Sequence, residues 1–396
     1  MKCITNITIL LLIIVTFKCF ALSTSIPEVK KGVINLNNID LKIPILPLNG
    51  EWEFYWKHLY EPKDFVSSKL KPDTFIAVPG SWTNLTIKGK RLENTGFATF
   101  RLKIHSESNS VICLSIKEIV CAYNLWVNGI KITQVGKVGT SKETSSPAIR
   151  HICETFNLQE GNNEIIIQVS NFAHSKNSFE CAPEIGEPTI IQHRNFNYSS
   201  EDIIVIGCLL ILVFYHLGLF IFRPGDYFNL VFVVFCLLAI SRILVSTNFT
   251  LGEFIPNVKW DYVYFIRYFS EYSLIPTLSY SVQLSIKEKS FKNIFRFIYI
   301  LSALSLITLL FPLPFYSKFV PVYEVMAGIY SIVITSCLIG KHFRSGQPGV
   351  RILLFSILVL TIIGINDMLY LNDKLNTREL FPLGIFIFSL GQSLTI

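Results

Sequence analysis

The chain has 396 residues, a mean hydropathy of +0.47, 51% hydrophobic residues and 16% charged residues. This composition excludes a soluble globular protein and predicts that part of the chain lies in a membrane. The formal net charge is +7, yet residues 24–201 carry 19 basic and 18 acidic side chains. A basic domain for nucleic acid is therefore not expected, and nucleic acid is not an expected partner.

The N-terminus predicts a secretory signal peptide over residues 1–23. Lys2 precedes an apolar run, Ile7–Phe17, which is too short to span a bilayer and is followed by small residues that suit cleavage. Export would leave the chain before Asp202 outside the cytoplasm. Residues 24–45 are predicted as an N-terminal linker.

Residues 46–195 change to short runs of β-branched and aromatic residues separated by turn residues. Alternation in the run that contains Arg101 and Lys103 buries one face and leaves these two side chains on the other. Asn128-Gly129 predicts a hairpin. The predicted strands are Glu51–Trp56, Thr74–Val78, Phe97–Ile104, Val111–Ile116, Tyr123–Val127, Ile130–Gln134 and Glu164–Val169. The pattern predicts an extracytoplasmic all-β sandwich of the jelly-roll type.

Four of the nine cysteines, Cys113, Cys121, Cys153 and Cys181, lie in the predicted exported domain. They allow two disulfides in any of three pairings, or buried thiols, and the sequence leaves this choice open. No CxxC or Cys/His spacing predicts a zinc site, and neither a metal nor a cofactor is expected.

Residues 203–396 contain seven apolar stretches of membrane-spanning length with polar or proline-rich breaks between them. A bilayer core about 30 Å thick needs about 20 residues of helix, because backbone amides in lipid are bonded within their own segment. The predicted spans are Ile203–Phe222, Phe228–Ser246, Asp261–Ile286, Ile294–Phe311, Phe319–Gly340, Val350–Leu371 and Leu380–Ile396. They predict an all-α bundle of seven transmembrane helices.

Seven spans from an outside start place the C-terminus in the cytoplasm. On this topology the inner loops and their flanks hold eight basic residues, whereas the outer ones hold four. This distribution agrees with the positive-inside rule and supports the predicted orientation.

Five motifs of the β domain occur in a familiar order: Gly50–Trp56, Val78–Trp82, Gly96–Arg101, Leu125–Gly129 and Ile167–Phe172. They resemble the sugar-binding jelly roll of β-galactosidase and β-glucuronidase enzymes. They resemble more closely the extracellular domain of bacterial seven-transmembrane receptors with diverse intracellular signalling modules.

The membrane half shares this resemblance, since Gly364–Tyr370 and Pro382–Ser393 are similar to the sixth and seventh helices of the receptor family. The resemblance covers residues 46–396. It implies a sensory receptor of the bacterial inner membrane that binds an extracytoplasmic ligand, with carbohydrate as one candidate. It also implies a cytoplasmic signalling partner.

The sequence departs from the family pattern at two places. His174–Ser178 stand where the family usually carries a Gly-Gly pair after the Ser-Asn-Phe strand. Such receptors also continue into a kinase, cyclase, diguanylate cyclase or phosphatase module, whereas the sequence ends at Ile396. The resemblance therefore implies an output module or partner outside this sequence.

Sugar sites combine an aromatic platform with a few polar groups on loops. Residues of these types at predicted strand ends or loops are Trp82, Asn84, Arg150, Asn171 and His174. They form the candidate ligand-binding set. The alternative for Trp82 is a core anchor, and for Arg150 and His174 a solvated loop position.

Charged side chains inside predicted spans are costly unless they are paired or hydrated. Five of them, Arg242, Arg267, Glu271, Glu324 and Asp367, fall toward the outer ends of their helices. One interpretation is that ion pairs in this layer hold the bundle together. The other is that the layer changes its pairing when ligand binds outside, and so couples the two domains. His216 is predicted to be a packed polar residue.

No Ser/His/Asp, HExxH, GxSxG or glycine-rich phosphate motif is present, so an enzyme is not expected. A transporter and a non-signalling surface-binding or scaffold protein are the alternatives. Seven spans do not divide into an inverted repeat, and a scaffold would need only one or two spans. The expected partners are the lipid bilayer, a small-molecule or carbohydrate ligand, and a cytoplasmic signalling protein.

Overall fold

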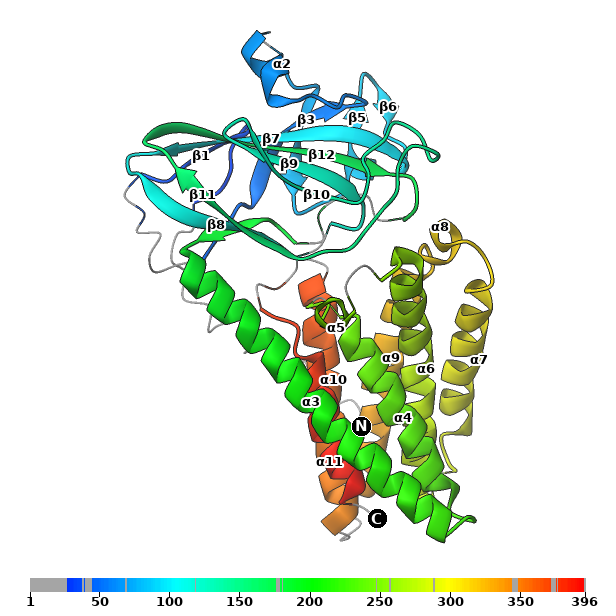
Figure 1. Ribbon diagram of the computed structural model, residues 1–396. Coiled ribbons are helices and arrows are strands. Elements are labelled where there is room, and N and C mark those ends of the chain that lie inside the picture. Colours follow the sequence, from blue (N-terminus) through cyan, green and yellow to red (C-terminus); the bar gives the residue numbers. More distant parts are fainter. Residues whose placement is uncertain are drawn as a thin grey trace.

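The computed structural model describes residues 27–394 apart from 38, 40–44, 68–69, 118, 176–178, 180, 247, 256–257, 288, 344–347, 372–374 and 376. The predicted signal peptide lies outside the described residues. The chain forms a β-sandwich and a helical bundle, which the long helix α3 (Pro188–Phe222) joins (Figure 1). This arrangement confirms the predicted order of an all-β domain followed by an all-α membrane domain.

The larger sheet has seven strands in the order β10-β9-β12-β7-β3-β4, and β1 pairs in parallel with β7. The central strands β7 and β12 are antiparallel and paired along their full length. The strands are β1 (Val33–Asn35), β3 (Gly50–Trp56), β4 (Thr74–Val78), β7 (Gly96–Ser106), β9 (Ala122–Val127), β10 (Ile130–Val135) and β12 (Gly161–Asn171).

The smaller sheet has four strands in the order β11-β8-β13-β2. Of the four cysteines whose pairing the sequence left open, Cys113 and Cys153 form a disulfide, which joins the neighbouring strands β8 and β11. The strands are β2 (Leu46–Pro47), β8 (Ser110–Ile116), β11 (Ile152–Leu158) and β13 (Glu184–Gly186). Small elements outside both sheets are helix α2 (Pro62–Ser67), a 3-10 turn (Trp82–Asn84) and the β5 (Thr86–Ile87) and β6 (Lys90–Arg91) hairpin.

The hydrophobic core lies between the sheets because side chains alternate along each strand. On β7, Phe100 and Leu102 are fully buried in the core, whereas Arg101 and Lys103 point to the opposite face. The seven predicted strands are all present. Strand β11 was not predicted, because its apolar and polar residues do not separate cleanly between its two faces.

Part of the predicted linker, residues 24–45, belongs to the sandwich. Val33–Asn35 form β1 and pair with Lys103–His105 of β7, and Val29 and Leu36 are buried in the same core. The sandwich therefore begins before residue 46. The run is so short that strand periodicity cannot be recognised in it.

Each of the seven predicted spans corresponds to a helix in the described chain. These helices are α3, α4 (Tyr227–Leu244), α6 (Trp260–Ile286), α7 (Lys292–Thr308), α9 (Val320–His342), α10 (Pro348–Leu371) and α11 (Phe381–Ser393). Among the described residues, α3, α4, α9 and α10 are long and apolar enough to cross a membrane by length and composition alone. Two short helices, α5 (Leu251–Phe254) and α8 (Leu313–Tyr316), lie at the end of the bundle that faces the sandwich (Figure 1).

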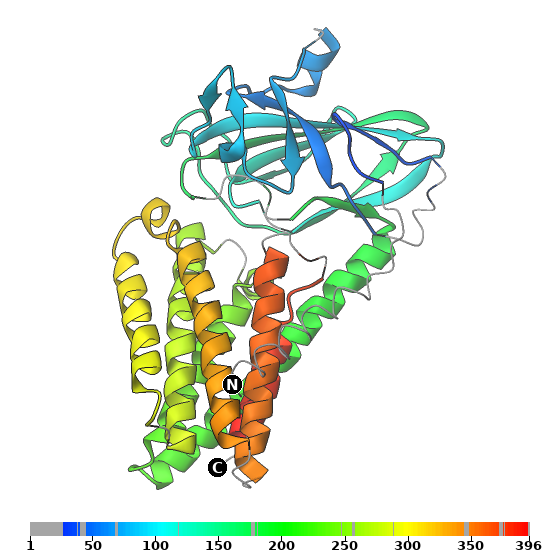
Figure 2. The same cartoon turned by 180° about the vertical axis from the view of Figure 1, so that it is seen from behind.

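Helix α3 is longer than a bilayer requires. Its 35 residues span about 50 Å at 1.5 Å per residue, against a hydrocarbon core of about 30 Å. The excess turns carry the helix past the predicted span, which starts at Ile203, up to strands β8 and β11 of the smaller sheet. In Figure 1, α3 runs as one slanted rod from the sandwich to the far end of the bundle, and in the view from behind its lower part passes behind other helices (Figure 2). The two domains are thus joined by continuous helix.

Candidate functional site

A cleft of about 1070 Å³ lies between the sandwich and the membrane domain. Its walls come from the loop between β10 and β11, the end of β12, the turns of α3 nearest the sandwich, helix α5 and the start of α6. Side chains of both domains therefore line one space, and a molecule bound there would touch both. The aromatic side chains in the lining are Phe172, Phe196, Tyr198, Phe249 and Trp260.

The cleft has a basic lining. Lys117, Lys142, Arg150 and Lys259 line it, against the two carboxylates Glu253 and Asp261. Five serines add hydroxyl groups to the same lining. The cleft therefore presents hydrogen-bond donors and a positive field to a polar ligand.

His151 is a neutral acceptor or donor in the wall of this cleft. Its burial, together with the charges of Lys117 and Arg267, lowers the pKa of His151 to about 3, so the ring stays uncharged at physiological pH. Its Nε2 atom has no hydrogen-bond partner within the described part of the chain. A buried polar atom without a partner is costly, and a ligand in the cleft could supply that partner.

Two of the five predicted ligand residues line the cleft. Arg150 donates to the Thr133 hydroxyl and forms an ion pair with Glu154 at 4.0 Å, while its side chain remains half exposed. Asn171 is only 2% exposed and holds the following loop: its Oδ1 accepts from the amides of Ala173 and His174 at 3.2 and 3.1 Å. Arg150 is thus placed to contact a ligand directly, and Asn171 shapes the wall.

One other predicted residue, Trp82, is not placed to act as a sugar platform. Trp82 is completely buried and donates from Nε1 to the carbonyl of Glu93 at 3.0 Å, with its ring against Phe54 and Trp56. This is the position of a core anchor. The side chain of Asn84 lies outside the part of the chain that the structure describes.

His174 joins the two domains. It lies in the loop after β12, is 1% exposed, and its Nε2 hydrogen-bonds the Tyr268 hydroxyl of α6 at 2.9 Å. Its ring also contacts Tyr264 with centroids 4.9 Å apart and Trp260 at 6.2 Å. In the same loop, the amide of Ser175 donates to Ser317 Oγ at 3.2 Å. The residue was predicted at a solvent-facing site, but the membrane domain covers it.

An aromatic column continues from this contact into the bundle. Trp260, Tyr264, Tyr268 and Tyr272 recur every fourth residue on one face of α6, with neighbouring ring centroids 4.7 to 6.4 Å apart. Tyr323 of α9 packs against Tyr272 at 4.7 Å. The column thus connects the cleft, which Trp260 lines, with the middle of the helices.

Four of the five predicted membrane charges line one cavity. Arg242, Glu271, Glu324 and Asp367 surround a space of about 240 Å³ within the bundle, so the predicted layer exists for these four. Arg267 points elsewhere: its Nε donates to the carbonyl of Val245 at 2.9 Å, and its guanidinium lies over the Tyr264 ring.

The sequence reasoning missed two acidic residues of this region. Glu379 lines the same cavity and forms an ion pair with Arg242 at 3.9 Å, but it precedes the predicted seventh span by one residue. Asp202 precedes the first span by one residue and accepts from Asn248 Nδ2 and Thr250 Oγ1 at 3.0 and 2.9 Å. A search that included span flanks would have found both.

His216 is a packed polar residue, as predicted. It is fully buried, and its Nδ1 lies 2.7 Å from Asn229 Oδ1 of the neighbouring helix. Among the described residues, no group of three or more His, Cys, Asp and Glu side chains is arranged to hold a metal ion.

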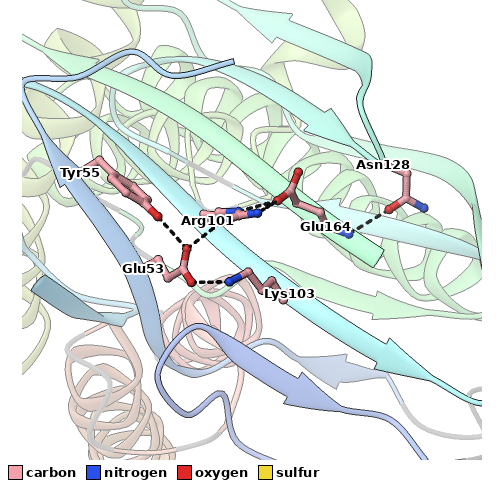
Figure 3. A network of polar contacts seen from close by, with 6 residues as sticks. All are labelled: Glu53, Tyr55, Arg101, Lys103, Asn128 and Glu164. Carbon is pink, nitrogen blue, oxygen red and sulfur yellow. Dashed lines mark hydrogen bonds and ion pairs between the residues drawn. The ribbon is translucent and has the colours of Figure 1, made fainter. Parts of the chain in front are cut away.

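The outer face of the larger sheet carries a polar network (Figure 3). Glu53 accepts from Lys103 Nζ and from the Tyr55 hydroxyl, both at 2.8 Å, and Arg101 bridges Glu53 and Glu164. Burial and the hydrogen bond to Glu53 raise the pKa of Tyr55. Two carboxylates and two basic side chains thus neutralise one another on this face of the sheet. In the described chain these residues lie outside the lining of the cleft.

Comparison with known proteins identifies the membrane half. The family described as 7TM diverse intracellular signalling matches residues 199–396. A search of curated proteins finds no match. Among solved structures, the chain is similar to a GH2 β-galacturonidase from Eisenbergiella tayi, bound to galacturonate in one crystal structure and to glycerol in another.

Both structural matches have a TM-score of 0.25 and 12% sequence identity, and cover 38% of this chain. They span 26% of the galacturonidase chain, about a quarter of its length. The family match extends over the whole predicted seven-helix domain and includes the charged cavity and the aromatic column. The chain is therefore a multi-pass membrane protein that belongs to the 7TM diverse intracellular signalling family.

Proposed function

We propose that this protein is a transmembrane sensory receptor whose ligand binds in the cleft between the sandwich and the bundle. The observation that carries the proposal is that residues of both domains line this cleft of about 1070 Å³. A ligand there favours whichever relative arrangement of the domains gives it more contacts, and this difference in affinity is what shifts a two-state equilibrium. The role is binding and transmission rather than catalysis.

The path of transmission runs through His174 and α6. A ligand in the cleft would contact Asn171 and Trp260, which line it. Asn171 accepts a hydrogen bond from the backbone amide of His174, in the loop that places His174 against Tyr268. The ring of Tyr268 stacks on that of Tyr272, which lies next to Glu271 and Glu324 of the charged cavity. Packed aromatic side chains have discrete arrangements, so a shift of one propagates as a change of packing.

The proposed orientation places the sandwich outside the cytoplasm and the C-terminal end of the bundle inside. The disulfide between Cys113 and Cys153 supports it, because such bonds persist in oxidising compartments. The eight basic residues at the opposite loops, against four on the sandwich side, support it as well. A bacterial inner membrane with a periplasmic sandwich satisfies both observations.

The proposed ligand is a hydroxylated molecule with negative charge, such as a sugar acid. Four basic side chains against two acidic ones favour an anion, and serine hydroxyls with Trp260 suit hydroxyl groups and the apolar face of a sugar ring. A cytoplasmic signalling protein, or an output module joined to the chain, would read the change at the inner ends of the helices.

Binding to the full chain in lipid nanodiscs tests the proposal, with D-glucuronate as the charged probe and D-glucose as its uncharged counterpart. We expect glucuronate to bind more tightly, and Arg150→Ala to weaken it about tenfold through loss of a charged hydrogen bond. Lys63→Ala, on the exposed helix α2, is the matched control and should leave binding unchanged. Binding that Arg150→Ala does not alter would contradict a ligand site in the cleft.

A further inference from the structure

The cavity inside the bundle has the shape and polarity of a binding site of its own. Side chains of α6, α9, α10 and α11 line a space of about 240 Å³, with contributions from α4 and α7. The described lining is largely aliphatic. Leu278 and Val282 of α6, Ile334 and Leu338 of α9, and Ile357 of α10 form its wall toward the inner side of the membrane.

Charge is concentrated at the opposite end of the cavity. Among the described residues of the lining, four carboxyl groups lie toward the sandwich side: those of Glu271, Glu324, Asp367 and Glu379. The same lining contains one guanidinium group, that of Arg242. Arg242 is engaged by Glu379 at 3.9 Å and lies over the ring of Phe381. The end nearest the sandwich therefore favours a cation, and the other end favours hydrocarbon.

Asp367 supplies a second, independent observation. The residue is only 7% exposed, and its Oδ1 accepts from the amide of Leu380 at 2.9 Å and from Asn366 Nδ2 at 2.8 Å. Its other oxygen, Oδ2, has no hydrogen-bond partner within the described chain. A buried carboxylate oxygen that is fixed in place and lacks a donor is a ready acceptor for an ammonium group.

We propose that this cavity binds a small amphiphilic amine, with its ammonium group at Asp367 Oδ2 beside Glu271 and Glu324, and its hydrocarbon chain along the aliphatic wall. The volume holds about eight water-sized groups. This suits an amine with one short chain and excludes a two-chain phospholipid. Such a ligand would join α6, α9 and α10 directly below the aromatic column.

The test uses the full chain in lipid nanodiscs and an n-octylamine that carries a diazirine near its methyl end. Irradiation should label α9 and α10 around Ile334 and Ile357, and excess n-octylamine should remove the label. The same concentration of n-octanol, octanoate or ammonium chloride should not. Asp367→Asn should raise the n-octylamine concentration for half displacement about tenfold or more, because the charge-assisted hydrogen bond is lost.

Two further variants keep the test decisive. Asp73→Asn, the same change at an exposed position of the sandwich that lines neither the cleft nor the cavity, should leave displacement unaltered. Gly364→Leu keeps every carboxylate and adds bulk at a lining position of the cavity, where a Cβ meets no heavy atom within 4 Å; it should abolish the labelling. Displacement by n-octanol as effective as by n-octylamine would overturn the proposal. So would equal displacement by ammonium chloride, or labelling that survives Gly364→Leu.

Discussion

Removing the His174 side chain should uncouple the two domains locally. His174→Ala breaks the 2.9 Å bond to Tyr268 and deletes a ring that is 1% exposed and packed on Tyr264. The hydrogen bond contributes about 1 kcal/mol net, and truncation of a buried aromatic ring costs about 3 kcal/mol or more in a rigid core. Because a loop can partly collapse into the space, we expect the docked state to lose about 2 to 3 kcal/mol.

Hydrogen exchange of the amides of Ala173 and His174 measures this loss, since both donate to Asn171 Oδ1 and open when the loop undocks. A loss of about 2 to 3 kcal/mol accelerates their exchange about 30- to 150-fold. Tyr268→Phe removes only the hydroxyl and should give about a fivefold to tenfold effect.

The matched control is His105→Ala, which truncates a partly exposed histidine on β7 of the same domain. It should change the exchange of these two amides less than about twofold, because the contact of its ring with Asn162 lies outside the loop that carries them. Exchange in His174→Ala that equals the parent's would refute the reasoning, since the loop would then be held by something other than this side chain.

Three further predictions follow from other parts of the structure. The folded pKa of about 3 for His151 lies below its unfolded value, so stability should be full above pH 6.5 and fall as the pH drops toward 3, by about 1.4 kcal/mol per unit. Between pH 6.5 and 5, the free energy of unfolding should depend less steeply on pH in His151→Phe than in the parent protein, as measured by tryptophan fluorescence during heating. Equal slopes in the two proteins would contradict the lowered pKa of His151. Arg101→Met leaves Glu53 and Glu164 without their shared cation and should destabilise the sandwich by about 2 kcal/mol in the same assay, whereas the exposed Lys63→Met should have almost no effect. Glu271→Gln should alter the change in spin-label distances that ligand causes at the inner ends of the helices, while membrane insertion stays normal. A response equal to that of the parent protein would show that Glu271 takes no part in transmission.

Much of the architecture could be predicted because it depends on local patterns. Alternation such as that of Phe100 and Arg101 specifies a strand and its buried face, and about 20 apolar residues specify a span, whatever the rest of the chain does. The same locality explains the omissions. Strand β1 has three residues and β2 has two, too few for a period to show, and they are held in place by partners elsewhere in the chain.

The candidate sites could be predicted only in part. The charged layer was found because a charge within an apolar run stands out, whereas Glu379 lies one residue outside the run and passed unnoticed. Arg150 was placed correctly on a loop, but nothing in its neighbourhood indicated that α3, α5 and α6 would form the other side of the cleft.

The sequence by itself determined the two kinds of structure in this chain and their order, because hydrophobic periodicity and the length of apolar runs are properties of neighbouring residues. Only the tertiary structure decided that His174 meets Tyr268, 94 positions away, and that four carboxyl groups from three helices and a loop line one cavity. Such contacts depend on how helices and sheets pack against one another, and on the side chains that fill the space between them. That information is distributed over the whole chain and has no local signature.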